Sequence, residues 1–172
     1  MKFKPLYYIV VASTIDGFIS FDEDSLPDWT SKEDKKHLKK MENKADVLLF
    51  SRKTYELAKK FVKKKKCIVL TSKVKNFFEE NKFLTWLNPK EASLESYVSS
   101  KGYKKICVLG GRGAYDFAIK KNLVKEIYLT IEPIILGKGI SMFSTCFKKK
   151  FKLVSVKKLN NKGSILLHYS KL

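Results

Sequence analysis

Short apolar runs alternate with longer amphipathic stretches over the first 124 residues of the chain. The apolar runs are bounded by polar residues or glycine, as buried central strands are. They lie at 6–12, 46–50, 66–72 and 105–110. Helical periodicity is found between and after them, at about 31–44, 53–62, 91–100 and 113–121. This alternation predicts an α/β fold with three layers, in which helices cover both faces of a mostly parallel sheet.

After residue 124 the pattern changes to strands alone, at 125–135, 152–160 and 164–170. The last two are joined by the sequence NNKG, a hairpin signal. We therefore expect an antiparallel C-terminal hairpin at one edge of the sheet. No linker or repeat interrupts the pattern, so residues 1–172 are predicted to form a single domain.

The composition is strongly basic, with 36 lysines and arginines against 17 acidic residues and a formal net charge of +19. Such a charge indicates an anionic partner such as nucleic acid. The lysines, however, are scattered through every segment, and aromatic residues such as Phe117 follow the apolar pattern instead of alternating with lysines. We interpret the charge as a solvated lysine coat and keep nucleic-acid binding as the less favoured alternative.

Several other classes of protein are not supported by the sequence. Three cysteines without a CxxC pair and only two histidines predict neither a disulfide framework nor a metal site. The N-terminal apolar run is too short to span a membrane, so we expect a cytoplasmic protein without a membrane partner. His37, expected to be exposed, and His168 have no partners at the spacing of a catalytic triad, so nucleophilic hydrolysis is not indicated.

Polar and basic residues follow three of the predicted strands. In an open α/β sheet, ligands bind at these carboxyl ends. Both arginines of the chain lie in such turns, which suggests an elongated ligand with several phosphates, such as a dinucleotide, although Ser and Thr are also common helix caps. The residues are Ser51, Arg52 and Thr54 after the second strand, Thr71, Ser72 and Lys73 after the third, and Arg112 after the fourth.

The stretch VLGGRGAY places three glycines between a strand and a helix. Glycine allows backbone N–H groups to approach an anion at a helix N-terminus. The spacing matches neither the GxGxxG fingerprint nor the P-loop. Read alone, it predicts an anion cradle of unspecified kind.

The segment before the first helix contains a candidate acid. Thr30 and Glu33 form a capping box that places the helix start near Ser31. Asp34 then lies on the core-facing stripe with Leu38, below Trp29. It is either a second capping group or an acid in a cleft, where desolvation would raise its pKa and suit it to donate a proton. Asp16 precedes Gly17 after the first strand and is read as a plain turn residue.

In order, these motifs resemble the dihydrofolate-reductase-like superfamily, and within it the reductase domain of riboflavin biosynthesis. The resemblance spans nearly the whole chain. Its most specific part is the glycine pair, the following helix and the sequence P-x-x-LGKG-x-x-x-F. The similar segments are VASTIDGFIS, DWTSKEDKKHL, ADVLLFSRKTYE, CIVLTSK, KICVLGGRGAYDFAIKKNLVKEIYLTIEPIILGKGISMF and the closing strand pair.

The resemblance implies a dihydrofolate-reductase-like fold, hydride transfer from NADPH and a possible homodimer. It implies that Asp34, with Thr130 as a hydrogen-bonding partner, binds a pteridine- or pyrimidine-like substrate and helps to protonate it. The residues expected beside the substrate are Ile15, Asp16, Trp29 and Leu38. Gly110 and Gly111 would bind phosphate through backbone N–H groups. The cofactor contacts that it implies are Ala12, Ser51, Arg52, Thr54, Thr71, Ser72, Lys73, Leu109, Gly110, Gly111, Arg112, Gly113, Ala114 and Tyr115.

The substrate is less well defined by the resemblance than the cofactor. Ser51 stands where the family usually has glycine, and the Asp-x-Pro-x-Leu-x-x-Arg element that binds ribose phosphate has no counterpart in YELAKKFVKKKKC. PIILGKG is nevertheless typical of the riboflavin branch. A 5-amino-6-(5-phosphoribosylamino)uracil reductase is the leading expectation, and the alternatives are a dihydrofolate reductase and a relative without activity.

Overall fold

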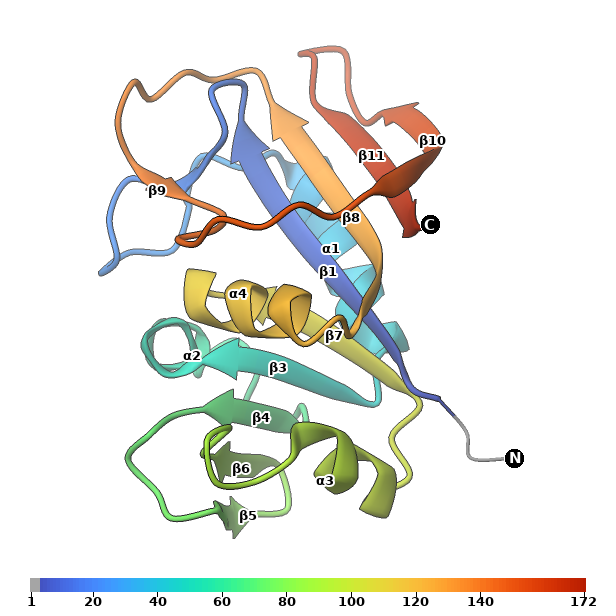
Figure 1. Ribbon diagram of the computed structural model, residues 1–172. Helices are drawn as coiled ribbons and strands as arrows, with labels where there is room; N and C mark the ends of the chain where they lie inside the picture. Colours follow the sequence, from blue (N-terminus) through green and yellow to red (C-terminus); the bar gives the residue numbers. More distant parts are fainter. Residues whose placement is uncertain (1–3) are drawn as a thin grey trace.

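The computed structural model describes residues 4–172, in which a nine-stranded sheet is the main element (Figure 1). From one edge to the other its strands are β10 (Phe151–Lys158), β11 (Ile165–Lys171), β8 (Val124–Glu132), β1 (Leu6–Thr14), β7 (Lys105–Gly110), β3 (Val47–Ser51), β4 (Cys67–Leu70), β6 (Leu84–Leu87) and β5 (Phe77–Asn81). The six strands from β8 to β6 are parallel, whereas β10, β11 and β5 are antiparallel to their neighbours. The predicted C-terminal hairpin is confirmed.

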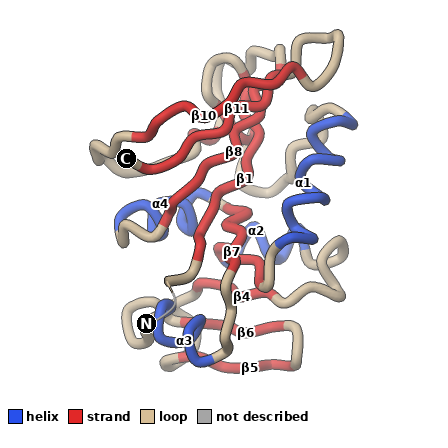
Figure 2. The backbone as a smooth tube through the Cα atoms, turned by 90° about the vertical axis from the view of Figure 1, so that its right-hand side faces the viewer, coloured by secondary structure: helices blue, strands red, loops and turns tan. Residues whose placement is uncertain are grey.

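Helices cover both faces of the sheet, as the three-layer prediction requires. The helices are α1 (Lys32–Lys44), α2 (Arg52–Ala58), α3 (Leu94–Ser100) and α4 (Arg112–Lys120). α1 and α2 pack on one face, and α3 and α4 pack on the other; Figure 2 shows α1 and α4 on opposite sides of the strands. None of the helices in residues 4–172 is long and apolar enough to cross a bilayer.

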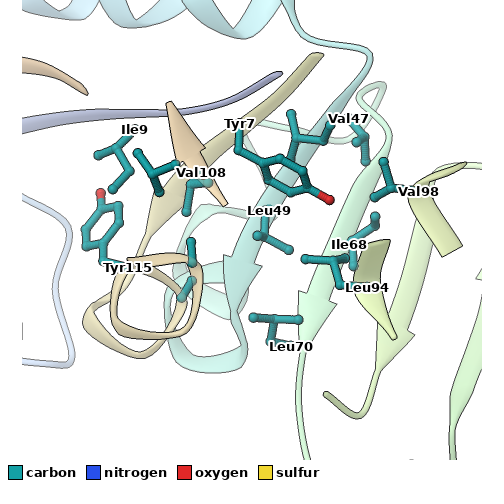
Figure 3. Close-up of a cluster of buried hydrophobic side chains, with 14 of the residues drawn as sticks. Tyr7, Ile9, Val47, Leu49, Ile68, Leu70, Leu94, Val98, Val108 and Tyr115 are labelled. Atoms are coloured by element: carbon teal, nitrogen blue, oxygen red, sulfur yellow. The ribbon is translucent and has the colours of Figure 1, made fainter. Parts of the chain in front are cut away.

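The strands are buried because both of their faces are apolar. In β1, Tyr7 and Ile9 join the core under α3 and α4, whereas Tyr8 and Val10 join the core under α1 and α2. Figure 3 shows the first of these cores, in which side chains of β1, β3, β4 and β7 meet those of α3 and α4. Burial on both faces explains why the central strands read as continuous apolar runs and not as alternating ones.

Three parts of the secondary structure differ from the prediction. The second helix ends at Ala58 instead of residue 62, although Val62 is still buried against the same core. The hairpin of β5 and β6 was not predicted, because β5 is exposed along its whole length and has no apolar face. A small second sheet of β2 (Phe18–Ser20) and β9 (Ile140–Ser141) was also missed, since each strand has only two or three residues.

The start of α1 is shifted by one residue from the predicted capping box. Ser31, not Thr30, is the N-cap, and its hydroxyl accepts from the backbone N–H of Asp34 at 3.2 Å. Glu33 does not reach back to the cap but accepts a hydrogen bond from Asn160 in the β10–β11 turn. Thr30 and Ser31 are both good capping residues, so the sequence alone did not decide between them. The contact of Glu33 with the β10–β11 turn is consistent with Ser31 as the N-cap.

The strand order brings the predicted turns together. β7, β3 and β4 are adjacent and parallel, so the turns that follow them lie at one edge of the sheet. Arg52 and Arg112 are the first residues of α2 and α4. The inference that both arginines lie in neighbouring strand-to-helix turns is therefore confirmed.

Candidate functional site

A cavity of about 850 Å³ opens at this carboxyl edge, between α1, α2 and the start of α4. A volume of this size is typical of a site for a small organic ligand. Eleven of the residues predicted for the site line the cavity, namely Ala12, Asp34, Leu38, Ser51, Thr54, Leu109, Gly110, Gly111, Arg112, Gly113 and Tyr115. The glycine turn and the candidate acid thus border one continuous space.

The glycine turn is built so that no side chain intrudes on this space. Gly110 has a φ of +117°, in the region that favours glycine, and its peptide bond to Gly111 is cis. A Cβ atom added to Gly111 would overlap Thr54 Oγ1. The backbone N–H of Gly111 donates to Ser51 Oγ at 2.7 Å. Ser51 therefore holds the turn in place, and this N–H is offered to a ligand only after it leaves Ser51.

Positive charge is contributed to this end of the cavity by α4 and by two cations. α4 begins at Arg112, directly at the cavity, and the N-terminus of a helix carries partial positive charge. Arg112 and Lys53, on neighbouring turns, both form ion pairs with Glu23, at 2.9 and 2.8 Å. These pairs are partly exposed and a ligand phosphate can replace the carboxylate.

Asp34 is the buried acid of the cavity and is only 5% exposed. Burial raises the pKa of its carboxyl group, and the nearby carboxylate of Glu132 raises it further, against the lowering effect of hydrogen bonds from Thr130 and Thr30. Thr130 is itself buried behind Asp34 and does not line the cavity. A raised pKa suits the carboxyl group to hold and deliver a proton.

Nine predicted site residues lie outside the cavity lining. They are Ile15, Asp16, Trp29, Arg52, Thr71, Ser72, Lys73, Ala114 and Thr130. Thr71, Ser72 and Lys73 nevertheless follow β4 at the same edge, next to the turn after β3, and Lys73 donates its backbone N–H to Thr71 Oγ1. Ser72 and Lys73 are exposed beyond the cavity, whereas Thr71 is buried.

Asp16 has a structural role that its sequence did not reveal. Its carboxylate accepts the backbone N–H groups of Leu136 and Gly137 and the hydroxyl of Thr14. These bonds lower the pKa of Asp16 and join the first turn to the LGKG segment. The reading as a local turn residue missed this long-range contact, and the expected contact with substrate has no support in the geometry.

The expectation that His37 is exposed was wrong. Its ring packs on Tyr128 of β8 with 5.8 Å between centroids, and its buried Nε2 has no hydrogen-bond partner. Desolvation, together with Lys40 and other lysines, lowers the pKa of His37. The periodicity of α1 did not reveal this contact because Tyr128 reaches the helix from another part of the chain.

Sequence reasoning missed further residues of the site. Glu23 was overlooked because charged loop residues carry no distinctive signal. Lys53, the second residue of α2, was overlooked because it stands at the variable position of the Ser-Arg-Lys-Thr turn. Leu57 on α2 and Phe61, three residues after the end of that helix, line an apolar part of the cavity. Glu132, beside Asp34, could have been found as the one acidic residue inside the apolar run 127–135.

Solved structures with this fold are known. A pyrimidine reductase-like protein from Corynebacterium diphtheriae superimposes with a TM-score of 0.74, at 14% identity over 98% of this chain and 92% of its own. A second structure is that of the diaminohydroxyphosphoribosylaminopyrimidine deaminase/5-amino-6-(5-phosphoribosylamino)uracil reductase from Thermotoga maritima. It superimposes with a TM-score of 0.74, at 18% identity, and the match includes 98% of this chain and 57% of the Thermotoga chain. The fold is therefore the dihydrofolate-reductase-like α/β fold.

The sequence comparison agrees with the structural one. Residues 7–170 match the family model described as dihydrofolate reductase, and the chain belongs to that family of NADPH-dependent reductases. A curated relative, the uncharacterized protein YwjB of Bacillus subtilis, is 24% identical over 98% of both chains. The resemblance predicted from the sequence is confirmed at the level of family and fold.

Proposed function

We propose that the protein is an NADPH-dependent reductase that transfers a hydride to a C=N or C=O group of a pyrimidine- or pteridine-type substrate. The observation that carries the proposal is the continuous cavity with the glycine turn at one end and the buried acid Asp34 at the other. Membership of a family of reductases and the fold of riboflavin-pathway pyrimidine reductases support it.

The residues of the first end fit a pyridine dinucleotide. The N-terminus of α4 and the cations Lys53 and Arg112 suit a pyrophosphate. Thr71, Ser72 and Lys73 would bind the adenosine part beyond the cavity. When bound, NADPH supplies the hydride. The chain holds the cofactor and substrate in one orientation and limits access of water.

The residues of the second end fit a heterocycle that accepts a proton. Asp34 faces the cavity and would hydrogen-bond the ring nitrogens of the substrate, with a proton kept on the carboxyl group by burial. Thr130 and Thr30 fix the carboxyl group through their hydroxyls. The leading substrate class is an aminopyrimidine related to 5-amino-6-(5-phosphoribosylamino)uracil, the substrate named for the Thermotoga enzyme.

A dihydrofolate-type substrate is the second candidate, and one feature favours it. Between α1 and α2 the cavity is lined by Leu38, Leu57, Phe61 and Val62, with Lys39 at the rim. This apolar arm suits an aromatic tail that ends in a carboxylate. A ribose there would place its hydroxyl groups against these apolar side chains, where they lack partners.

The test is a thermal-shift titration with NADPH, followed by NADPH oxidation with aminopyrimidine ribose phosphates and with dihydrofolate. We expect a stabilising shift with NADPH, larger than with NADH, and turnover of one substrate class. Phe61→Ala should raise KM for dihydrofolate and leave KM for an aminopyrimidine unchanged. Absence of any NADPH-induced shift would refute the proposal.

A further inference from the structure

Two buried carboxyl groups lie together at the acid end of the cavity. Asp34 is on α1 and lines the cavity, whereas Glu132 is at the end of β8, is 2% exposed and is not part of the lining. Two carboxylates in a desolvated site repel each other, so one of them holds a proton more readily than it would alone. The hydrogen bonds around the pair indicate which one.

Glu132 has a donor for each of its oxygens. The backbone N–H of Ser31 donates to Oε1 at 2.8 Å, and the hydroxyl of Ser164 donates to Oε2 at 2.5 Å. The Ser164 oxygen in turn accepts from Asn160 Nδ2 at 2.9 Å, which leaves its own proton for Glu132. Both oxygens of Glu132 are thus held by donors outside the cavity, whereas burial raises the pKa of Asp34, the member of the pair that faces the cavity.

The same contact frees Asp34 from a capping role. In a capping box, the side chain at the third helical position reaches back to the N–H of the N-cap residue. Here that position is Asp34 and the N-cap is Ser31, but the N–H of Ser31 is already bonded to Glu132. The carboxyl group of Asp34 is left to face the cavity and the hydroxyls of Thr130 and Thr30.

We propose that Glu132 is a positioning residue for Asp34: it anchors the start of α1 and leaves the proton of the buried pair on the carboxyl group that faces the cavity. This rests on the proposed function, in which Asp34 is the acid. Among other charged groups, Lys35 on the same helix acts in the opposite direction. Glu33, directly before Asp34 in the sequence, accepts a hydrogen bond from Asn160 and is exposed to solvent.

The experiment follows the carboxyl carbon of Asp34 by NMR in the free protein during a pH titration, with Asp34→Asn to assign the signal. Glu132→Gln keeps an acceptor for the N–H of Ser31 but removes the charge. In this variant we expect the titration midpoint of the Asp34 carboxyl group to fall by about one pH unit. Ser164→Ala removes one donor to Glu132 and should lower the midpoint by less. It is the second variant in case Glu132→Gln does not fold.

Glu33→Gln is the matched control, because it removes a carboxylate from the same helical turn that is bonded to the same Asn160. It should leave the midpoint unchanged. An unchanged midpoint in both Glu132→Gln and Ser164→Ala, or an equal fall in Glu33→Gln, would overturn the proposal.

The proposed function is tested separately. If a substrate is turned over, the pH of half-maximal rate should move in Glu132→Gln in the same direction as the midpoint, while the NADPH-induced thermal shift stays the same. If the wild-type protein shows no response to NADPH, the proposed function fails. The NMR titration, which needs neither cofactor nor substrate, then still decides whether Glu132 controls Asp34.

Discussion

The two ends of the cavity are built by different means. At the glycine turn, the shape is set by the backbone of Gly110, with φ of +117°, and by one bond from Gly111 to Ser51 on the neighbouring turn, 60 residues earlier in the chain. At the acid end, Asp34 depends on Thr130, Glu132 and Ser164, which are about one hundred residues or more away in sequence. The first end is complete once β3, β7 and α4 have assembled, whereas the second also needs β8 and the C-terminal hairpin.

The largest expected effect is chemical and falls on the acid end alone. Asp34→Asn removes the proton donor and should lower the turnover rate by about 10²–10⁴-fold, as losing a general acid does. The NADPH-induced thermal shift should persist, because the glycine turn does not contact Asp34 through any bond described above. A thermal-shift titration beside the rate assay checks this. Loss of the cofactor response in this variant would show that the two ends are not independent.

The next effect falls on the glycine turn. In Gly111→Ala the new Cβ overlaps Thr54 Oγ1 and lies 3.3 Å from Ser51 Oγ, so we expect a loss of stability of about 1–3 kcal/mol and a weaker NADPH response. Denaturant unfolding measures the stability. For stability alone, Gly113→Ala is the matched control, since its Cβ would find its nearest neighbour at 3.9 Å. Equal destabilisation by both substitutions would contradict the close approach of Thr54 to Gly111.

A smaller effect is expected from the ion pairs over the glycine turn. Glu23→Gln frees Lys53 and Arg112 for a ligand phosphate, so NADPH affinity should rise a few-fold at low salt, with the gain fading as salt screens the charges. Glu56→Gln breaks a comparable exposed pair with Lys59 outside the cavity lining and should not change affinity. A fall in affinity in Glu23→Gln would instead mean that Glu23 closes the loop over the bound cofactor.

The smallest expected effect is a pH dependence of the protein's stability that arises on α1, the helix that carries Asp34. The pKa of His37 on α1 is lowered from 6.5 by burial, so the unfolded chain binds the proton more readily than the folded one. Stability from this residue is present above pH 6.5 and is lost as the pH falls towards the lower, folded-state pKa. Melting temperatures between about pH 7.5 and pH 5 should decline less in His37→Gln than in the wild type. Equal slopes would contradict this assignment.

The sequence was sufficient for the parts of the fold that are determined locally. The apolar runs of β1, β3, β4 and β7 and the amphipathic face of α1 predicted three layers. The turns at Arg52 and Arg112 predicted the edge of the sheet at which the cavity opens. β5 was not predictable because it is exposed along its length and has no apolar pattern.

The acid end shows the limit of such reasoning. The position of Asp34 followed from the helical period, but its freedom from capping depends on Glu132, and the burial of His37 depends on Tyr128. Both contacts join elements that are distant in sequence. The apolar arm of the cavity also lay outside local patterns, because it is formed where α1 meets α2 and the residues beyond it.

The C-terminal hairpin has a consequence for the order of synthesis. Asn160 and Ser164, in the turn between β10 and β11, are bonded to Glu33 and Glu132. A chain that emerges from the ribosome N-terminus first can assemble the glycine turn as soon as β7 and α4 have left the exit tunnel. Asp34 must wait for the last strand pair, so a nascent chain would gain its cofactor end before its acid end.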